Sequence, residues 1–363
     1  MKLIQSLSLL VAFAGAAGMV ASQGCGSSDD GGGASSGAGR TPPAPPSGAA
    51  PSDTPARTFA VNQIFLGETD RKGAPLKDAW KDYGYNIDGL ATVKESKDVC
   101  TRVTGADSIK QEDGKDGIDN SFGRTVLGFI LGLEPAPTKT VNDSIQRGDF
   151  TIMLEVKGLT DDPKQTSTGL SGRLLIGGPY GENKIPTFAP EDDWPYRAEP
   201  IVPLSGAYIS NGTFVNGQSG AAVQIALFLQ GMALSLNIRR AAITFDHTSP
   251  NELTNGTISG VVATEELLSG IEKVASRISD QLCTGSTLDT IKQTIRWASD
   301  IRQDGTNGPG ATCDGISIGL GFTAKKIGAP TTLAKEAVLP PDPCAAKADG
   351  GVEGGVEGGA DGG

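Results

Sequence analysis

The chain is poor in aromatic residues (5%), has a single histidine, and has fewer basic residues (31) than acidic ones (42). Its net charge of −11 excludes a general electrostatic nucleic-acid binder, because such proteins need a basic face to displace the counterions of the phosphate backbone. One histidine and the absence of a CxxC pair argue against a zinc site. After the first 24 residues no run of about 18 apolar residues occurs, so no later segment is expected to span a membrane as a helix.

Composition divides the 363 residues into four parts. Residues 1–24 begin with a positive charge and continue with a long apolar stretch, which predicts a signal peptide or, alternatively, an uncleaved N-terminal anchor. Residues 25–57 and 347–363 are rich in glycine and other small residues, with proline in the first of them. They cannot bury enough apolar surface to offset the entropy of ordering. We therefore predict a disordered tether and a disordered tail on either side of a globular body, residues 58–346.

The segment Ser22-Gln23-Gly24-Cys25, followed by a polar Gly/Ser/Asp run, resembles the lipobox of bacterial lipoproteins. The match departs from that family at Ser22, where leucine is preferred, and at Gln23, where a small residue is preferred. Ordinary signal cleavage nearby therefore stays open as an alternative. The chain as a whole is similar in pattern to uncharacterised lipoproteins of Gram-negative bacteria.

The resemblance implies cleavage before Cys25, acylation of that residue and, with Gly26 after it, transfer to the outer membrane. The body would then face the periplasm or the cell surface. The membrane is the expected partner. Several acyl chains must hold the protein there, because the acidic body adds no attraction to an anionic surface. The sequence identifies no protein or glycan partner.

Four further cysteines form an even set that predicts disulfides in an oxidising compartment, with buried free thiols as the alternative. Three pairings are possible. We favour Cys283–Cys313, which would close a helical segment leading into a strand, together with Cys100–Cys344, which would tie an early part of the body to its end.

Alternation of apolar and polar side chains predicts strands, and Asn-Gly pairs predict turns between them. The strands are expected within residues 150–157, 223–230, 234–239 and 316–323, and the turns at Asn211-Gly212, Asn216-Gly217 and Asn255-Gly256. Together they predict a mainly β, antiparallel, sandwich-like fold, with an α+β fold as the alternative.

Three helices are expected beside the strands. One begins at Asn120 or Ser121 and stops before Pro135, because proline breaks a helix. The other two have apolar side chains at helical spacing and run from Thr264 to Cys283 and from Ser286 to Ile301. We expect these two to cover one end or one face of the sheet.

The densest acidic cluster runs from Glu112 to Asn120 and resembles the Asp/Gly/Asn calcium loops of secreted proteins, such as the thrombospondin type 3 repeat. Calcium prefers six to eight oxygen ligands, and carboxylates spaced by glycines can supply them. Ca²⁺ is therefore a candidate cofactor, with Asp113, Asp116, Asp119 and Asn120 as its ligands and Asp88 as a possible addition. The alternative is that these residues build turns and cap the following helix.

The loop Glu191–Arg197 carries carboxylates beside Trp194 and Tyr196, which could stack a sugar or hold a peptide. Paired carboxylates such as Asp192 and Asp193 can also hydrolyse glycosides. The alternative is a loop whose Trp194 packs on the core. The single histidine, His247, is either a general base beside Asp246 or a polar residue at the end of a strand.

We expect a lipid-anchored envelope protein that acts as a non-enzymatic binding or structural module, with calcium as a candidate stabiliser. No catalytic residue is assigned. The alternative, from another class, is a secreted hydrolase such as a glycosidase that uses the carboxylates at 191–193.

Overall fold

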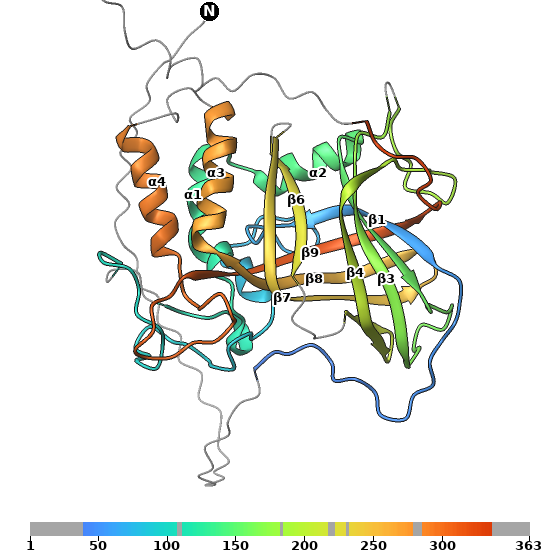
Figure 1. Ribbon diagram of the computed structural model, residues 1–363, viewed down its shortest axis with the longest axis horizontal. Helices are drawn as coiled ribbons and strands as arrows, with labels where there is room; N and C mark the ends of the chain where they lie inside the picture. Colours follow the sequence, from blue (N-terminus) through green and yellow to red (C-terminus); the bar gives the residue numbers. More distant parts are fainter. Residues whose placement is uncertain are drawn as a thin grey trace, which may run out of the picture. The chain divides into compact units, whose positions relative to one another are not determined.

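The computed structural model describes residues 39–106, 111–181, 184–216, 222–229, 232–278 and 285–335. Nine antiparallel strands in these residues form one sheet, in the order β5-β4-β3-β2-β1-β9-β8-β7-β6. A further pairing between β5 and β7 joins the sheet to itself, so all strands except β6 close into an eight-stranded barrel (Figure 1). The prediction of a mainly β fold is confirmed, but the fold is a closed barrel and not a sandwich.

The elements have the following bounds. The strands are β1 (Arg57–Phe65), β2 (Thr151–Lys157), β3 (Ser167–Gly177), β4 (Tyr196–Ser210), β5 (Thr213–Val215), β6 (Val223–Leu229), β7 (Met232–Ser249), β8 (Glu252–Ala263) and β9 (Gly315–Ile327). The helices are α1 (Leu127–Leu133), α2 (Pro137–Arg147), α3 (Thr264–Ile278) and α4 (Ser286–Trp297). Shorter helical turns span Ala79–Asp82, Lys115–Gly117 and Phe122–Val126.

Apolar side chains fill the barrel. In β2 the alternate residues Ile152, Leu154 and Val156 belong to the main core, together with side chains from every other barrel strand. Met153, on the opposite face, is also fully buried, because the loop that contains Trp194 packs over the outside of the barrel there. The parallel rings of Phe214 and Phe245, with centroids 4.4 Å apart, stack within this core. The interior is therefore packed with side chains.

The predicted strands are all present, within β2, β6, β7 and β9. Asn211-Gly212 forms the predicted two-residue turn between β4 and β5, and both residues have positive φ. Asn255-Gly256 is not a turn but a bulge inside β8, where Gly256 lies against the ring of Phe322 and a Cβ would come within 2.6 Å of it. Asn216-Gly217 extends outside the described residues.

The predicted helices are confirmed as Phe122–Val126 with α1, as α3 and as α4, although α4 ends at Trp297 rather than Ile301. Helices α1, α3 and α4 lie together on one side of the barrel (Figure 1). Helix α2 was not predicted. It is fixed to β1 by Asn142, whose amide accepts from the backbone N–H of Ile64 at 2.7 Å and donates to its carbonyl at 3.0 Å. None of the described helices is long and apolar enough to cross a bilayer.

Residues 39–56, which we call the strap, lie along the barrel (the blue segment in Figure 1). The hydroxyl of Tyr208 donates to the carbonyl of Pro43 at 2.5 Å, and the backbone N–H of Gly158 donates to the carbonyl of Thr54 at 2.9 Å. The backbone N–H of Arg40 donates to the carbonyl of Asp116 at 2.7 Å. The sequence predicts a disordered tether over 25–57, and the strap, which belongs to that range, makes these hydrogen bonds with the body. Residues 25–38 lie outside the described residues.

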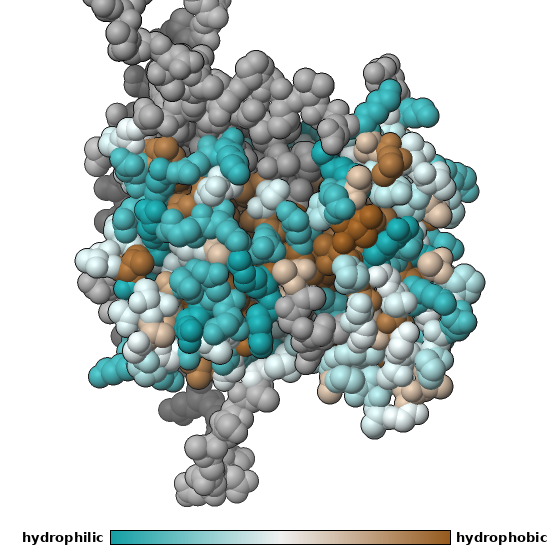
Figure 2. All heavy atoms as spheres, viewed as in Figure 1, coloured by the Kyte–Doolittle hydropathy of each residue, from teal (hydrophilic) through white to brown (hydrophobic). Residues whose placement is uncertain are grey.

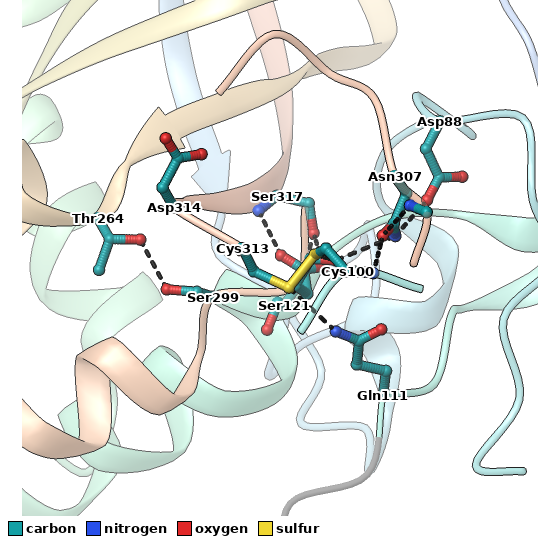
Figure 3. Close-up of a disulfide and its surroundings, with 12 residues drawn as sticks. Asp88, Cys100, Gln111, Ser121, Thr264, Ser299, Asn307, Cys313, Asp314 and Ser317 are labelled. Carbon is teal, nitrogen blue, oxygen red and sulfur yellow. Dashed lines mark hydrogen bonds between the residues drawn. A yellow bond between two sulfur atoms is a disulfide. The ribbon is translucent and has the colours of Figure 1, made fainter. Parts of the chain in front are cut away.

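One disulfide joins Cys100 to Cys313, whose Cα atoms are 5.3 Å apart (Figure 3). Both favoured pairings, Cys283–Cys313 and Cys100–Cys344, are therefore wrong. The bridge does not close a helical segment. It ties the long connection between β1 and α1 to the residues just before β9, beside a backbone bridge between Thr101 and Thr312. Cys25, Cys283 and Cys344 lie outside the described residues.

Candidate functional site

The predicted calcium ligands lie in the long connection between β1 and α1, where they make structural hydrogen bonds. The carboxylate of Asp113 accepts from the N–H of Thr92 at 2.5 Å. Asp119 accepts from the backbone N–H of Ile87 at 2.6 Å. These bonds fix the turns of the connection, as the alternative interpretation of the sequence requires.

Asn120 is buried against β9. Its amide donates to the carbonyl of Gly319 at 3.1 Å and accepts from the N–H of the same residue at 3.0 Å. Asp116 is exposed, in a left-handed turn with φ 54°. No group of three or more His, Cys, Asp or Glu side chains in the described ranges could hold a metal ion. The residues therefore do not fit calcium as the sequence suggested.

Buried carboxyl groups nevertheless gather near the disulfide. Burial raises the pKa of Asp113 to about 7, and the negative charges of Asp88 and Asp300 add to the rise. Burial also raises the pKa of Asp119 well above its usual range, again with repulsion from Asp88. The pKa of Asp300 is raised by burial, although its carboxylate accepts from the N–H and hydroxyl of Ser317 at 2.9 and 2.6 Å. Ionisation of these carboxyl groups destabilises the folded protein, so its free energy of unfolding depends on pH.

The carboxylates proposed for hydrolysis are both engaged in hydrogen bonds, Asp192 within its own loop and Asp193 with the segment that follows β9. Asp192 accepts hydrogen bonds from Tyr180, Thr187 and Phe188. Asp193 accepts from Thr331 and Thr332. In each case burial opposes ionisation, but the hydrogen bonds outweigh it and hold the pKa below its ordinary value. A glycosidase needs one carboxyl group with a raised pKa as the acid, and neither residue meets that requirement.

Trp194 has no exposed surface. Its indole N–H donates to the carbonyl of Gly178 at 2.7 Å, and its ring packs between Tyr180 and Phe188 with centroids 5.1 and 5.7 Å away. Tyr196 is half-buried at the start of β4. The ring of Trp194 therefore cannot stack a ligand in this arrangement, and the predicted aromatic platform is wrong for that residue.

His247 is buried inside the barrel, with its ring edge-on to Phe59 at a centroid distance of 6.0 Å. Burial lowers its pKa to about 4, and the charge of Arg57 adds to the fall. Neither ring nitrogen has a hydrogen-bond partner in the described part of the chain. The neighbouring Asp246 is bonded instead to Thr213 and Asn255. The two residues form no acid–base pair.

A polar hollow lies between α3 and the ribbon formed by β6 and the first part of β7. Its volume is about 350 Å³. The polar and charged side chains that line it are those of Gln224, Ser235, Asn237, Glu266, Ser269 and Lys273. Gln224 and Asn237 are directly opposite each other on the paired strands. Figure 2 shows that the surface over α3 and α4 is mainly hydrophilic. We call this site the ribbon hollow.

The ribbon hollow presents amide and hydroxyl groups beside two charged side chains, those of Glu266 and Lys273. Its amides, on Gln224 and Asn237, make no side-chain hydrogen bond with the described residues, and neither do the hydroxyls of Ser235 and Ser269. The carboxylate of Glu266 is neutralised by Arg239, which donates to its two oxygens at 2.6 and 3.0 Å. Amides and hydroxyls can each donate and accept, so this wall complements the hydroxyl groups of a ligand.

The sequence contained one part of this site. The polar residues that alternate with the apolar ones in residues 223–230 and 234–239 include Gln224, Ser235 and Asn237. Alternation predicts a polar face, but it does not show that α3, some 30 residues later, borders that face.

The whole chain was also compared with known proteins. It matches no known protein family, no curated protein and no solved structure.

Proposed function

We propose that the chain is an exported, lipid-tethered binding module of the cell envelope and that its ligand-binding site is the ribbon hollow. The observation that carries the binding role is the set of amide and hydroxyl groups on facing elements that make no side-chain hydrogen bond with the described residues. The engagement of Asp192 and Asp193 in loop hydrogen bonds favours this role over the hydrolase.

Export is supported by the buried Cys100–Cys313 bridge, because disulfides persist in oxidising compartments such as the periplasm. The tether is supported by the lipobox-like sequence that ends at Cys25. Acylation of that residue would hold the body at the membrane surface without any spanning segment.

The chemistry of the ribbon hollow favours a neutral ligand rich in hydroxyl groups, such as a carbohydrate. Each amide can exchange two hydrogen bonds with neighbouring sugar hydroxyls. The Arg239–Glu266 pair forms a planar, charge-balanced rim. A ligand that lacks those hydroxyls would make fewer hydrogen bonds with the amides and hydroxyls of the hollow and would bind more weakly.

The test is an array of neutral oligosaccharides probed with the full chain, followed by calorimetry on any sugar that binds. The double variant Gln224→Ala with Asn237→Ala is expected to weaken binding about tenfold or more, from the loss of two or more hydrogen bonds. Asn251→Ala, on the exposed turn between β7 and β8, is the matched control and should bind normally. Equal affinity of the double variant, or the absence of binding to every neutral sugar, contradicts the proposed ligand class.

A further inference from the structure

Three arginines near Tyr83 and Tyr85 form no ion pair with the part of the chain that the structure describes, although the net charge is −11. The ion pairs found among the described residues do not include Arg40, Arg71 or Arg240. Acidic side chains outnumber basic ones, so unpartnered arginines are unexpected on electrostatic grounds. Such arginines either pack against neighbouring side chains or bind an anionic ligand.

Two of these arginines are partly explained by packing. The guanidinium of Arg40 lies 5.7 Å from the ring centroid of Tyr85, and that of Arg71 lies 4.8 Å from the ring centroid of Tyr83. Arg71 also donates to the carbonyl of Gly256 at 2.7 Å. Burial lowers the pKa of Arg71, and the charge of Arg40 lowers it further. The two cations therefore repel each other, and the charge of Asp246 offsets only part of the effect on Arg71.

The third arginine, Arg240, stacks on none of the described aromatic rings. Its side chain lies beside Gly305 and lines a hollow of about 240 Å³, which we call the arginine hollow. Arg240 lies at a bulge of β7 with φ 52°, a left-handed conformation that is costly for a residue with a side chain. It is exposed. Tyr85, against which Arg40 stacks, forms another part of the same wall.

The arginine hollow also offers hydroxyl donors. Ser259 lines it, and the oxygen of its side chain accepts from the N–H of Tyr85 at 3.2 Å, which leaves its own O–H to donate. Thr41, from the strap, contributes a second hydroxyl at the rim. An exposed guanidinium, a nearby second guanidinium and two hydroxyls make a set of donors, and no carboxylate is among the described residues that line the hollow.

We propose that the arginine hollow binds a phosphate group, with Arg240 as its main ligand and Arg40 as a second positive charge close by. The planar fork of a guanidinium donates two parallel hydrogen bonds to phosphate oxygens, and the hydroxyls can donate to the remaining oxygen. The backbone cost at Arg240 is consistent with a side chain held in place for a ligand.

Two sources can present this group, a lipid headgroup or a soluble phosphate ester. The strap places Arg40 next to the end of the described chain. Thirteen residues lie between Cys25 and Gly39, so the two are fourteen residue steps apart and can be separated by no more than about 50 Å. If Cys25 is acylated as proposed above, the arginine hollow stays within reach of headgroup phosphates. Binding of phosphate itself does not depend on that acylation.

The experiment follows the reaction of phenylglyoxal with individual arginines of the full chain, measured by peptide mass spectrometry. Inorganic phosphate is titrated against sodium chloride at constant ionic strength. Phosphate is expected to slow the modification of Arg240 about fivefold or more and that of Arg40 to a smaller extent. Arg147, an exposed arginine on α2 that pairs with Asp149, is the internal control and should change less than about twofold.

Variants and a second phosphate source complete the test. Arg240→Asn keeps a residue that tolerates the left-handed backbone, and it should weaken phosphate binding about tenfold in a phosphorus NMR titration. Arg147→Asn should not. Phosphatidylcholine vesicles with and without phosphatidic acid form the lipid arm, again with Arg240 protection as the readout. Protection by both phosphate and phosphatidic acid supports a headgroup site, and protection by phosphate alone supports a soluble ester.

The proposal is overturned if phosphate protects Arg240 no better than chloride does. It is also overturned if acetate protects as well as phosphate, since the site would then select no phosphate chemistry. Circular dichroism of Arg240→Asn shows whether a loss of binding reflects a loss of fold. If the variant does not fold, the protection of Arg240 from phenylglyoxal by phosphate in the unmodified chain decides whether the hollow binds phosphate.

Discussion

Replacing Asp113 with asparagine is expected to stabilise the protein above neutral pH. Asparagine keeps an oxygen that can accept the hydrogen bond from the N–H of Thr92, but it cannot ionise. The pKa of Asp113 rises from an ordinary value of 3.8 to about 7 in the folded protein, mainly through burial. This difference of about 3 units corresponds to about 4 kcal/mol at 1.36 kcal/mol per unit, an upper bound.

The sign follows from proton linkage. A carboxyl group with a raised pKa in the folded state contributes stability that is fully present below pH 3.8 and is lost as the pH rises through about 7. The unmodified protein should therefore lose stability between about pH 4 and pH 7. Asp113→Asn lacks this loss, so the difference between the two proteins should be near zero at about pH 4 and reach up to about 4 kcal/mol at about pH 8.

Urea unfolding at several pH values, followed by circular dichroism, measures this difference. Asp116→Asn is the matched control, because Asp116 is exposed in the same segment and its positive φ suits asparagine. The control should show no pH-dependent gain. The reasoning is refuted if Asp113→Asn gains nothing between pH 4 and pH 8, or if the control gains as much.

Three further outcomes are expected. Replacing both Cys100 and Cys313 with serine should lower the free energy of unfolding by about 5 kcal/mol on the loop-entropy model, because the bridge spans 213 residues. A loss below about 1 kcal/mol in urea titrations would contradict a structural role for the disulfide. Burial lowers the pKa of His247 to about 4, so the protein should lose stability as the pH falls from 6.5 through 4. His247→Phe should remove this loss and raise the free energy of unfolding by up to about 3 kcal/mol at low pH. If the variant loses as much stability in acid as the unmodified protein, the imidazole is not buried in its neutral form. Thermal melts with calcium and with chelator should have the same midpoint, and a higher midpoint with calcium would restore the acidic segment as a metal site.

Local patterns predicted the strands and most of the helices, because a period of two or 3.6 residues reports which side chains are buried. The same alternation occurs in a sandwich and in a barrel. The difference depends on the pairing of the short β5 with β7, which brings Thr213 opposite Asp246 across 33 residues. Helix α2 was missed because its buried apolar positions are few, notably Val141 and Ile145, and because Asn142 fixes it through a contact with β1.

Long-range partners were the part that the sequence could not supply. The cysteine count predicted disulfides, but the pairing of Cys100 with Cys313 follows from a loop that packs beside the start of β9. The carboxylates at Asp192 and Asp193 looked available in sequence. Tyr180 engages Asp192 from the same loop, but Thr331, which engages Asp193, lies 138 residues away. Nor does a pattern show which arginines lack a carboxylate, as Arg240 does, since that depends on every neighbouring element.

Mass spectrometry of the protein extracted from native membranes under non-reducing conditions tests the central claim most directly. We predict an N-terminal peptide that begins at Cys25 and carries acyl chains, in the same molecule as a peptide pair linked through Cys100 and Cys313. An unmodified N-terminus at Met1, with Cys100 and Cys313 recovered as free thiols, would contradict both export and the lipid tether.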